Sequence, residues 1–129
     1  MPKSEKKKIL VVEDEATLNQ IYQNKLESSG YEVVSAYDGE DAIIKAGETM
    51  PDLVLLDLML PKKSGYDVLT EMKKDEKIKD IPVMILSNLG QEEDVKRGIS
   101  LGAVDFVTKS NIKLADLMKK IEEVFKNKN

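Results

Sequence analysis

The chain has 129 residues, the usual size of one domain, and 41% of them are hydrophobic, which is enough for an ordinary core without cross-links. It contains neither cysteine nor histidine, which excludes disulfides, thiolate chemistry and a phospho-histidine role, so any metal site must be built from oxygen. The formal net charge of −4 argues against general nucleic-acid binding, and no apolar run approaches the roughly 18 residues of a membrane span; we predict a soluble cytoplasmic domain.

The first eight residues are polar and rich in lysine, so we expect residues 1–8 to form a flexible basic tail with no signal-peptide core behind it. The first predicted strand, 9–12, is a short apolar run followed at once by acidic residues. A helix comes next and stops at Gly30, because apolar side chains recur before that glycine at helical spacing: Leu18, Ile21, Tyr22 and Leu26. Residues 31–36 predict the second strand.

The middle of the chain is organised around Asp57. An Asp-Gly pair at 38–39 begins the second helix, and residues 53–56 form an apolar run typical of a strand buried on both faces. This third strand ends on Asp57, and an acid at that place costs free energy unless a neighbour needs it. Ser64 is then predicted to cap the third helix, with Asp67 at the capping-box position.

The rest of the chain repeats this alternation. Residues 81–86 and 103–107 predict the fourth and fifth strands, with a short helix between them that ends near Gly102. The last helix has the clearest apolar stripe: Leu114, Leu117, Met118, Ile121, Val124 and Phe125. Alternating strands and helices predict an α/β fold with a parallel five-stranded sheet covered by five helices on both faces.

Polar side chains follow four of the five predicted strands, and parallel strands place these ends at one edge of the sheet. Carboxylates that are close together repel, and a divalent cation held by hard oxygen ligands, such as magnesium, relieves the repulsion. A lysine adds a charge suited to phosphate, and a hydroxyl adds a hydrogen bond. Each residue alone has an ordinary explanation as a cap, a turn residue or a surface lysine, but their joint placement favours a site made of Glu13, Asp14, Asp57, Ser87 and Lys109.

Five segments in this order resemble the receiver domain of two-component response regulators along essentially the whole chain: ILVVEDE (9–15), DGEDA (38–42), PDLVLLDLMLP (51–61), IPVMILS (81–87) and GAVDFVTK (102–109). The resemblance implies one receiver domain over residues 9–127. Its expected architecture is a doubly wound, flavodoxin-like parallel sheet with strand order 2-1-3-4-5. It also implies a signalling switch that catalyses only its own phosphorylation and dephosphorylation.

The roles of the site residues follow from the resemblance. Asp57 would accept a phosphoryl group from the phospho-histidine of a sensor histidine kinase or phosphotransfer protein. Magnesium, which manganese can replace, would be held by Asp57, by Asp14 directly, by Glu13 through water and by the Met59 carbonyl. Lys109 and Ser87 would bind phosphoryl oxygens, and Phe106 would rotate inward as the switch aromatic. Without the resemblance, Phe106 would be interpreted simply as a residue of the hydrophobic core. Chemistry of this kind needs positioning and charge neutralisation rather than acid–base groups.

The same resemblance implies output through the face formed by the fourth helix, the fifth strand and the fifth helix. This face would dock a downstream protein target that the sequence does not name, with no direct contact to nucleic acid or membrane. Homodimerisation through the same face on phosphorylation, known in the family, is left open. The chain ends after the fifth helix, so it fits either a single-domain regulator or a receiver cut from a longer protein.

The chain departs from the family pattern in two places. Ser110 stands where proline commonly follows the active-site lysine through a cis bond; because a cis bond without proline costs about 2.5–4 kcal/mol, we expect a trans bond and a locally different loop. Met59 and Leu89 stand where many members carry polar groups that orient the hydrolytic water, and neither offers such a side-chain hydrogen bond. We therefore predict slow hydrolysis of phospho-Asp57.

Three alternative functions fit the sequence less well. A haloacid-dehalogenase-type phosphatase with an aspartate nucleophile needs a second acid two residues later, where this chain has Met59. A flavodoxin-like FMN-binding module needs a Ser/Thr-rich phosphate loop after the first strand, where residues 13–15 are acidic and would repel phosphate. A receiver-like scaffold that is never phosphorylated would not need the complete set of acids, hydroxyl and lysine.

Overall fold

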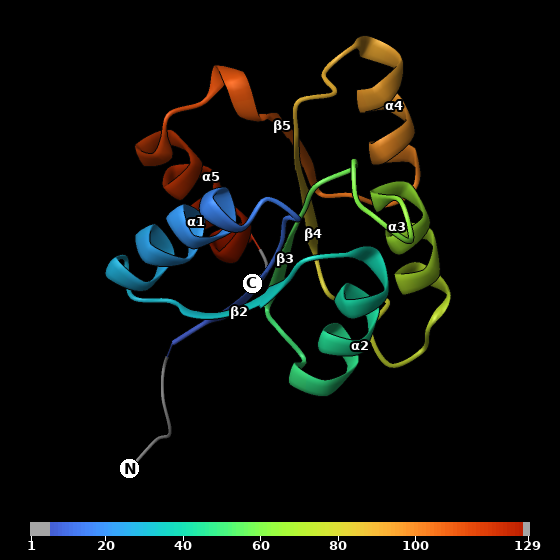
Figure 1. Cartoon of the computed structure of the whole chain (residues 1–129), viewed down its shortest axis with the longest axis horizontal. Helices are drawn as coiled ribbons and strands as arrows, with labels where there is room; N and C mark the ends of the chain where they lie inside the picture. The colour runs from blue at the N-terminus through green and yellow to red at the C-terminus, as the bar shows by residue number, and fades with distance from the viewer. Residues whose placement is uncertain (1–5, 128–129) are drawn as a thin grey trace.

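The apolar runs form the strands of one sheet, in which all pairs are parallel and the order is β2-β1-β3-β4-β5, as predicted (Figure 1). The computed structural model describes residues 6–127. Its strands are β1 (Lys8–Val12), β2 (Glu32–Ala36), β3 (Leu53–Leu56), β4 (Val83–Ser87) and β5 (Asp105–Thr108). The helices are α1 (Ala16–Ser28), α2 (Gly39–Thr49), α3 (Gly65–Lys74), α4 (Glu92–Ser100) and α5 (Leu114–Asn127), with a short 3₁₀ turn, η1 (Lys109–Asn111), before α5.

The sheet lies between two layers of helices. Figure 1 shows α1 and α5 on one face and α2, α3 and α4 on the other. Because successive strand side chains point to opposite faces, each central strand contributes to two cores. Leu10, Val54 and Ile85 pack toward α2 and α3, whereas Ile9, Leu55 and Met84 pack toward α1 and α5. This double covering explains why β3 has no polar alternation.

The register places the ends of the central strands together. Val12, the last residue of β1, pairs with Ala36 of β2 and with Leu56 of β3, and Leu56 pairs in turn with Ile85 of β4. The next residues along β1 and β3 are Glu13 and Asp57, so the backbone register alone makes them neighbours. The predicted convergence of strand ends at one edge of the sheet is confirmed.

Capping residues fix where α2 and α3 begin. The Asp38 side chain accepts the N–H of Asp41 at 2.8 Å, and the Ser64 hydroxyl accepts the N–H of Asp67 at 3.2 Å, which confirms the predicted cap of α3. After α1, Gly30 adopts a φ of +100°, a conformation that glycine reaches without strain, and the chain turns into β2.

Several strand boundaries differ from the prediction by one or two residues. β1 begins at Lys8, the last residue of the predicted tail, and the Lys8 ammonium donates to the Thr49 carbonyl at 2.9 Å. Residues 1–5 of that tail lie outside the described residues. β4 begins at Val83, directly after Pro82, which has no N–H to donate. β5 begins at Asp105 rather than at residue 103, because the N–H of Ala103 still bonds to the Gly98 carbonyl of α4.

Helix α4 is attached to the sheet differently from the others. Of its nine residues, all of which are described, only Gly98 is buried. A Cβ on Gly98 would lie 2.6 Å from Ile85 Cδ1 and 3.2 Å from Phe106 Cδ2, so glycine lets the helix backbone rest directly on these side chains. Tyr66 of α3 adds a second attachment: its hydroxyl donates to the Asp94 carbonyl at 3.2 Å, and its ring lies 3.9 Å from the Arg97 guanidinium.

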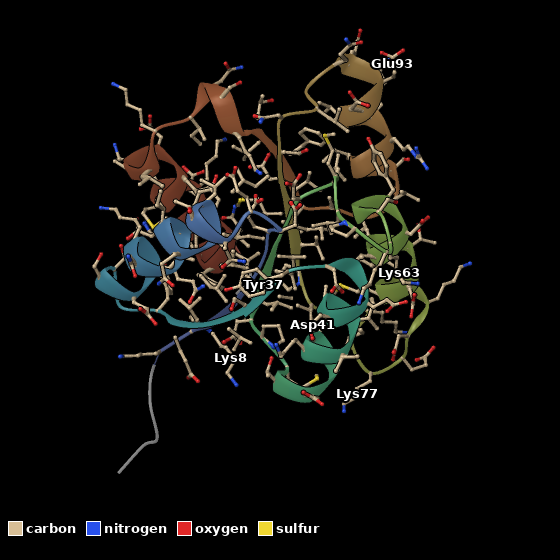
Figure 2. All side chains as sticks on the ribbon, viewed as in Figure 1. Lys8, Tyr37, Asp41, Lys63, Lys77 and Glu93 are labelled. Carbon is tan, nitrogen blue, oxygen red and sulfur yellow. The ribbon has the colours of Figure 1, made fainter. Side chains whose placement is uncertain are left out.

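Charged side chains extend from the outside of the molecule, as Lys77 and Glu93 do in Figure 2. Within residues 6–127, no helix combines the length and the apolar character that crossing a membrane would require.

Candidate functional site

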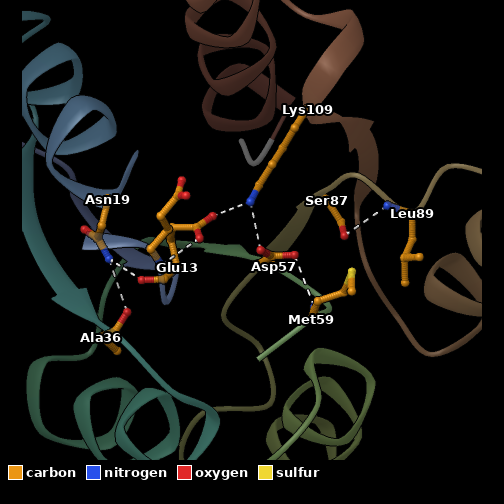
Figure 3. A network of polar contacts seen from close by, with 9 residues as sticks. Glu13, Asn19, Ala36, Asp57, Met59, Ser87, Leu89 and Lys109 are labelled. Atoms are coloured by element: carbon orange, nitrogen blue, oxygen red, sulfur yellow. Dashed lines mark hydrogen bonds and ion pairs between the residues drawn. The ribbon is translucent and has the colours of Figure 1, made fainter. Parts of the chain in front are cut away.

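Lys109 joins the acids that follow β1 and β3. Its ammonium donates to Asp57 Oδ2 at 2.8 Å and also to Glu13 Oε1 (Figure 3). The three side chains are only 11%, 8% and 4% exposed for Lys109, Asp57 and Glu13, so the charges are nearly withdrawn from solvent. A buried cation between two buried anions offsets the repulsion that the acids would otherwise feel.

The protonation behaviour of this cluster follows from its burial. Burial raises the pKa of the Glu13 carboxyl, and the hydrogen bond from Lys109 and the N–H of Glu15 offset only part of that effect. Burial also disfavours the Lys109 ammonium, but hydrogen bonds from it to Asp57 and Glu13, together with their charges, outweigh burial and raise the pKa of Lys109. The lysine therefore stays charged, and burial favours the protonated form of the Glu13 carboxyl.

The third acid, Asp14, lies on the exposed side of the cluster. One carboxylate oxygen from each of Glu13, Asp14 and Asp57 lies within 4.8 Å of the others. This donor set contains only hard oxygen atoms, and it combines two buried acids with one that solvent reaches. Such a set fits magnesium, which takes one or two carboxylates and keeps several water ligands.

Met59 and Ser87 lie near Asp57, on the side that faces away from Glu13 (Figure 3). The Met59 N–H donates to Asp57 Oδ1 at 3.2 Å, while its side chain is 60% exposed and offers no polar group. The Ser87 side chain is fully buried, and its hydroxyl accepts the N–H of Leu89 at 3.3 Å. Figure 3 shows Ser87 and Glu13 on opposite sides of Asp57. The predicted magnesium ligation by the Met59 carbonyl stays a prediction.

Phe106 lies in β5, three residues before Lys109, and Ser110 directly follows that lysine. The half-buried Phe106 packs against the core shared with α2 and α3 and lies next to Gly98 of α4. No peptide bond within residues 6–127 is cis, so the predicted trans bond between Lys109 and Ser110 is confirmed. The chain continues from Lys109 through η1, whose cap at Ile112 leads into α5.

Sequence reasoning missed Asn19. This residue of α1 is fully buried, and its amide Nδ2 donates to the Glu13 carbonyl at 2.9 Å and to the Ala36 carbonyl at 3.3 Å. A signal was present in the sequence: Asn19 lies three residues before Tyr22 and seven before Leu26, so helical spacing puts a polar side chain on the buried face of α1. A polar residue in such a position needs hydrogen-bond partners.

The sequence matches a protein family described as the response regulator receiver domain over residues 9–122. Among curated proteins, it is 44% identical over 104 residues to the probable transcriptional regulator ycf27 of Guillardia theta, covering 81% of this chain and 40% of that protein. The chain therefore spans less than half the length of this relative.

Solved structures show the same architecture. The receiver domain of the Francisella response regulator 1452 superposes with a TM-score of 0.88 and 27% identity, covering 95% of this chain and 99% of that one. The receiver domain of the sensor histidine kinase PA1611 from Pseudomonas aeruginosa PAO1, solved with a magnesium ion in its active site cleft, superposes with a TM-score of 0.83 and 27% identity, covering 92% and 96%.

Proposed function

Because this chain belongs to the receiver domain family of response regulators in two-component signalling, we propose that its Asp57 accepts a phosphoryl group from the phospho-histidine of a sensor histidine kinase or a phosphotransfer protein. One observation carries the proposal: Asp57 is buried at the carboxyl end of the central strand, with Lys109 on one carboxylate oxygen and the Met59 N–H on the other. A carboxylate held in this way is oriented before any donor arrives.

The chemistry is a phosphoryl transfer between two side chains. A carboxylate oxygen of Asp57 attacks the phosphorus atom, the P–N bond of the donor breaks, and the bonding electrons return to the imidazole nitrogen. The product is an acyl phosphate on Asp57. Since the transfer needs alignment and charge neutralisation rather than acid–base catalysis, a histidine-free site can support it.

Glu13, Asp14 and Asp57 are the side chains that would hold magnesium or manganese, with the Met59 carbonyl as a further ligand. When bound, the cation neutralises charge on the transferred phosphoryl oxygens. The ammonium of Lys109 supplies the protein's own positive charge at the same place, where it bonds to two of the three acids. Lys109 would exchange its bond to Glu13 for one to a phosphoryl oxygen.

We further propose that Ser87 and Phe106 report the phosphorylated state. The Ser87 hydroxyl already faces the edge that carries Asp57, and Phe106 connects this edge with α4 through Gly98. Movement of these two side chains would alter the face formed by α4, β5 and α5, where a protein target docks. We propose that the domain acts in this way as a signalling switch in the cytoplasm, and that it docks a protein rather than nucleic acid.

Incubation with magnesium and acetyl phosphate tests the proposal. Intact-mass spectrometry is expected to show a product heavier than the chain by one phosphoryl group, and removal of the metal with EDTA is expected to suppress its formation, because the clustered carboxylates repel an anionic donor. EDTA saturated with magnesium serves as the control for the chelator. If the wild-type chain gains no phosphoryl group with magnesium present, the proposed function is wrong.

The lifetime of the phosphoryl group is a further expected property of this site. Replacing two apolar residues by polar ones, in Met59→Asn with Leu89→Glu, is expected to speed the decay of phospho-Asp57 at least about tenfold, because a positioned polar group can orient the attacking water. Decay is timed by intact mass after acetyl phosphate is removed. The matched variant Met59→Leu with Leu89→Met, which stays apolar, is expected to decay like the wild type; equal decay in both variants would contradict the prediction.

A further inference from the structure

The buried face of α1 carries an amide that the phosphoryl chemistry does not use. Asn19 is fully buried and lies on the same face of the helix as Tyr22 and Leu26, whose side chains fill the core between α1 and the sheet. Burying an amide in such a place costs free energy unless its polar atoms find partners. The partners that Asn19 has found are main-chain atoms at the edge of the site.

The side chain of Asn19 connects the ends of two strands. Nδ2 donates to the carbonyl of Glu13, at the end of β1, and to the carbonyl of Ala36, the last residue of β2 (Figure 3). The orientation of the amide is fixed because Oδ1 accepts Nε2 of Gln23 at 2.8 Å. The Glu13 N–H itself donates to the Ala36 carbonyl at 3.1 Å. The main chain of Glu13 is therefore held through both its N–H and its carbonyl.

Further bonds extend this hold along the loop between β1 and α1. The N–H of Asn19 donates to the Glu15 carbonyl at 2.9 Å, and the N–H of Glu15 donates to Glu13 Oε2 at 3.0 Å. One carboxylate oxygen of Glu13 is thus oriented by the loop, while the other bonds to Lys109. Loss of the Asn19 amide would free the Glu13 carbonyl and let this loop, with Asp14 in it, change its position.

We propose that Asn19 is a positioning residue that holds the main chain of Glu13 and thereby sets the affinity of the Glu13–Asp14–Asp57 cluster for its divalent cation. The inference rests on the proposed function, because it takes this cluster as the metal site. Residues that hold metal ligands in place typically change metal affinity 10–100-fold when they are removed. Asn19 touches neither the cation nor the phosphoryl group, so its effect is transmitted through Glu13.

Calorimetric titration of the unphosphorylated chain with magnesium chloride tests this, together with thermal unfolding in EDTA. Asn19→Ala is expected to weaken magnesium binding about tenfold. The matched control is Leu26→Ala, two turns along the same buried face, which removes core packing without touching the loop. This control is expected to lower Tm at least as much as Asn19→Ala and to leave the magnesium Kd unchanged, so the two measurements separate positioning from stability.

The outcomes distinguish this inference from the proposed function. A wild-type chain that binds no magnesium would overturn both. If the wild type binds magnesium and Asn19→Ala binds it equally well despite a lower Tm, only the positioning role is wrong. If Asn19→Ala does not fold, Gln23→Ala provides the test, because it removes the hydrogen bond that orients the Asn19 amide. Gln23→Ala is expected to weaken magnesium binding by a smaller factor than the about tenfold loss expected for Asn19→Ala. Unchanged affinity in that variant would count against the role.

Discussion

Replacement of Asp57 by asparagine is expected to abolish the phosphoryl adduct that forms with magnesium and acetyl phosphate. The amide has nearly the shape of the carboxylate, so Asp57→Asn keeps the packing at the end of β3. It removes the charged oxygen that attacks phosphorus and one of the two acids to which Lys109 donates. Intact-mass spectrometry under conditions that phosphorylate the wild type measures the loss.

A second acid on the same strand provides the control for this replacement. Asp52 lies just before β3, at the opposite end of the strand from Asp57, where its carboxylate accepts the N–H of Lys8 at 2.8 Å. Asp52→Asn is expected to gain the phosphoryl group like the wild type, because it lies away from the acid cluster. An adduct that persists in Asp57→Asn would show that another side chain is the acceptor, and peptide mapping would then identify it.

Replacement of Lys109 by methionine is expected to destabilise the metal-free protein by about 3 kcal/mol, near the lower end of the cost of breaking a buried ion pair. Methionine keeps the length of the apolar stem but leaves Glu13 and Asp57 buried without their cation. The cost is at the lower end because burial already raises the pKa of Glu13, so this acid can take up a proton and relieve the repulsion.

Magnesium makes this prediction specific to the site. Since the cation would restore the missing positive charge, it is expected to raise the free energy of unfolding of Lys109→Met more than that of the wild type, as measured by urea denaturation with magnesium or EDTA. Lys62→Met is the control: Lys62 is 58% exposed, 3.6 Å from Asp38, and such pairs contribute at most about 1 kcal/mol. An equal response of Lys109→Met and the wild type to magnesium would refute the prediction.

The sheet and the main acids of the site could be predicted because they depend on local patterns. An unbroken apolar run at 53–56 requires cover on both faces, and this leads to a parallel sheet whose strand ends meet at one edge. Asp57, Glu13 and Lys109 were then placed together by topology alone. The strand order itself came from the resemblance to receiver domains, since five parallel strands can be arranged in more than one way.

The hydrogen-bond partners of the site residues could not be predicted, because they depend on distances between side chains that are far apart in sequence. Lys109 donates to both Glu13 and Asp57, whereas the sequence suggested only that it would bind phosphate. Asn19 was overlooked because helical spacing shows that its position is buried but does not show which carbonyls lie opposite. The start of β5 was misplaced because the turn after α4 extends into residues whose composition is typical of a strand.

The attachment of α4 through Gly98 has a consequence for local unfolding. Glycine inside a helix costs about 1 kcal/mol relative to alanine, and this helix inserts no large side chain of its own into the core. Detaching α4 would therefore withdraw no large side chain from the core. We expect it to cost less free energy than detaching α3, which buries Val68, Leu69 and Met72. The fold thus combines an edge where charges are held in place with one helix that we expect to open at a lower free energy than α3.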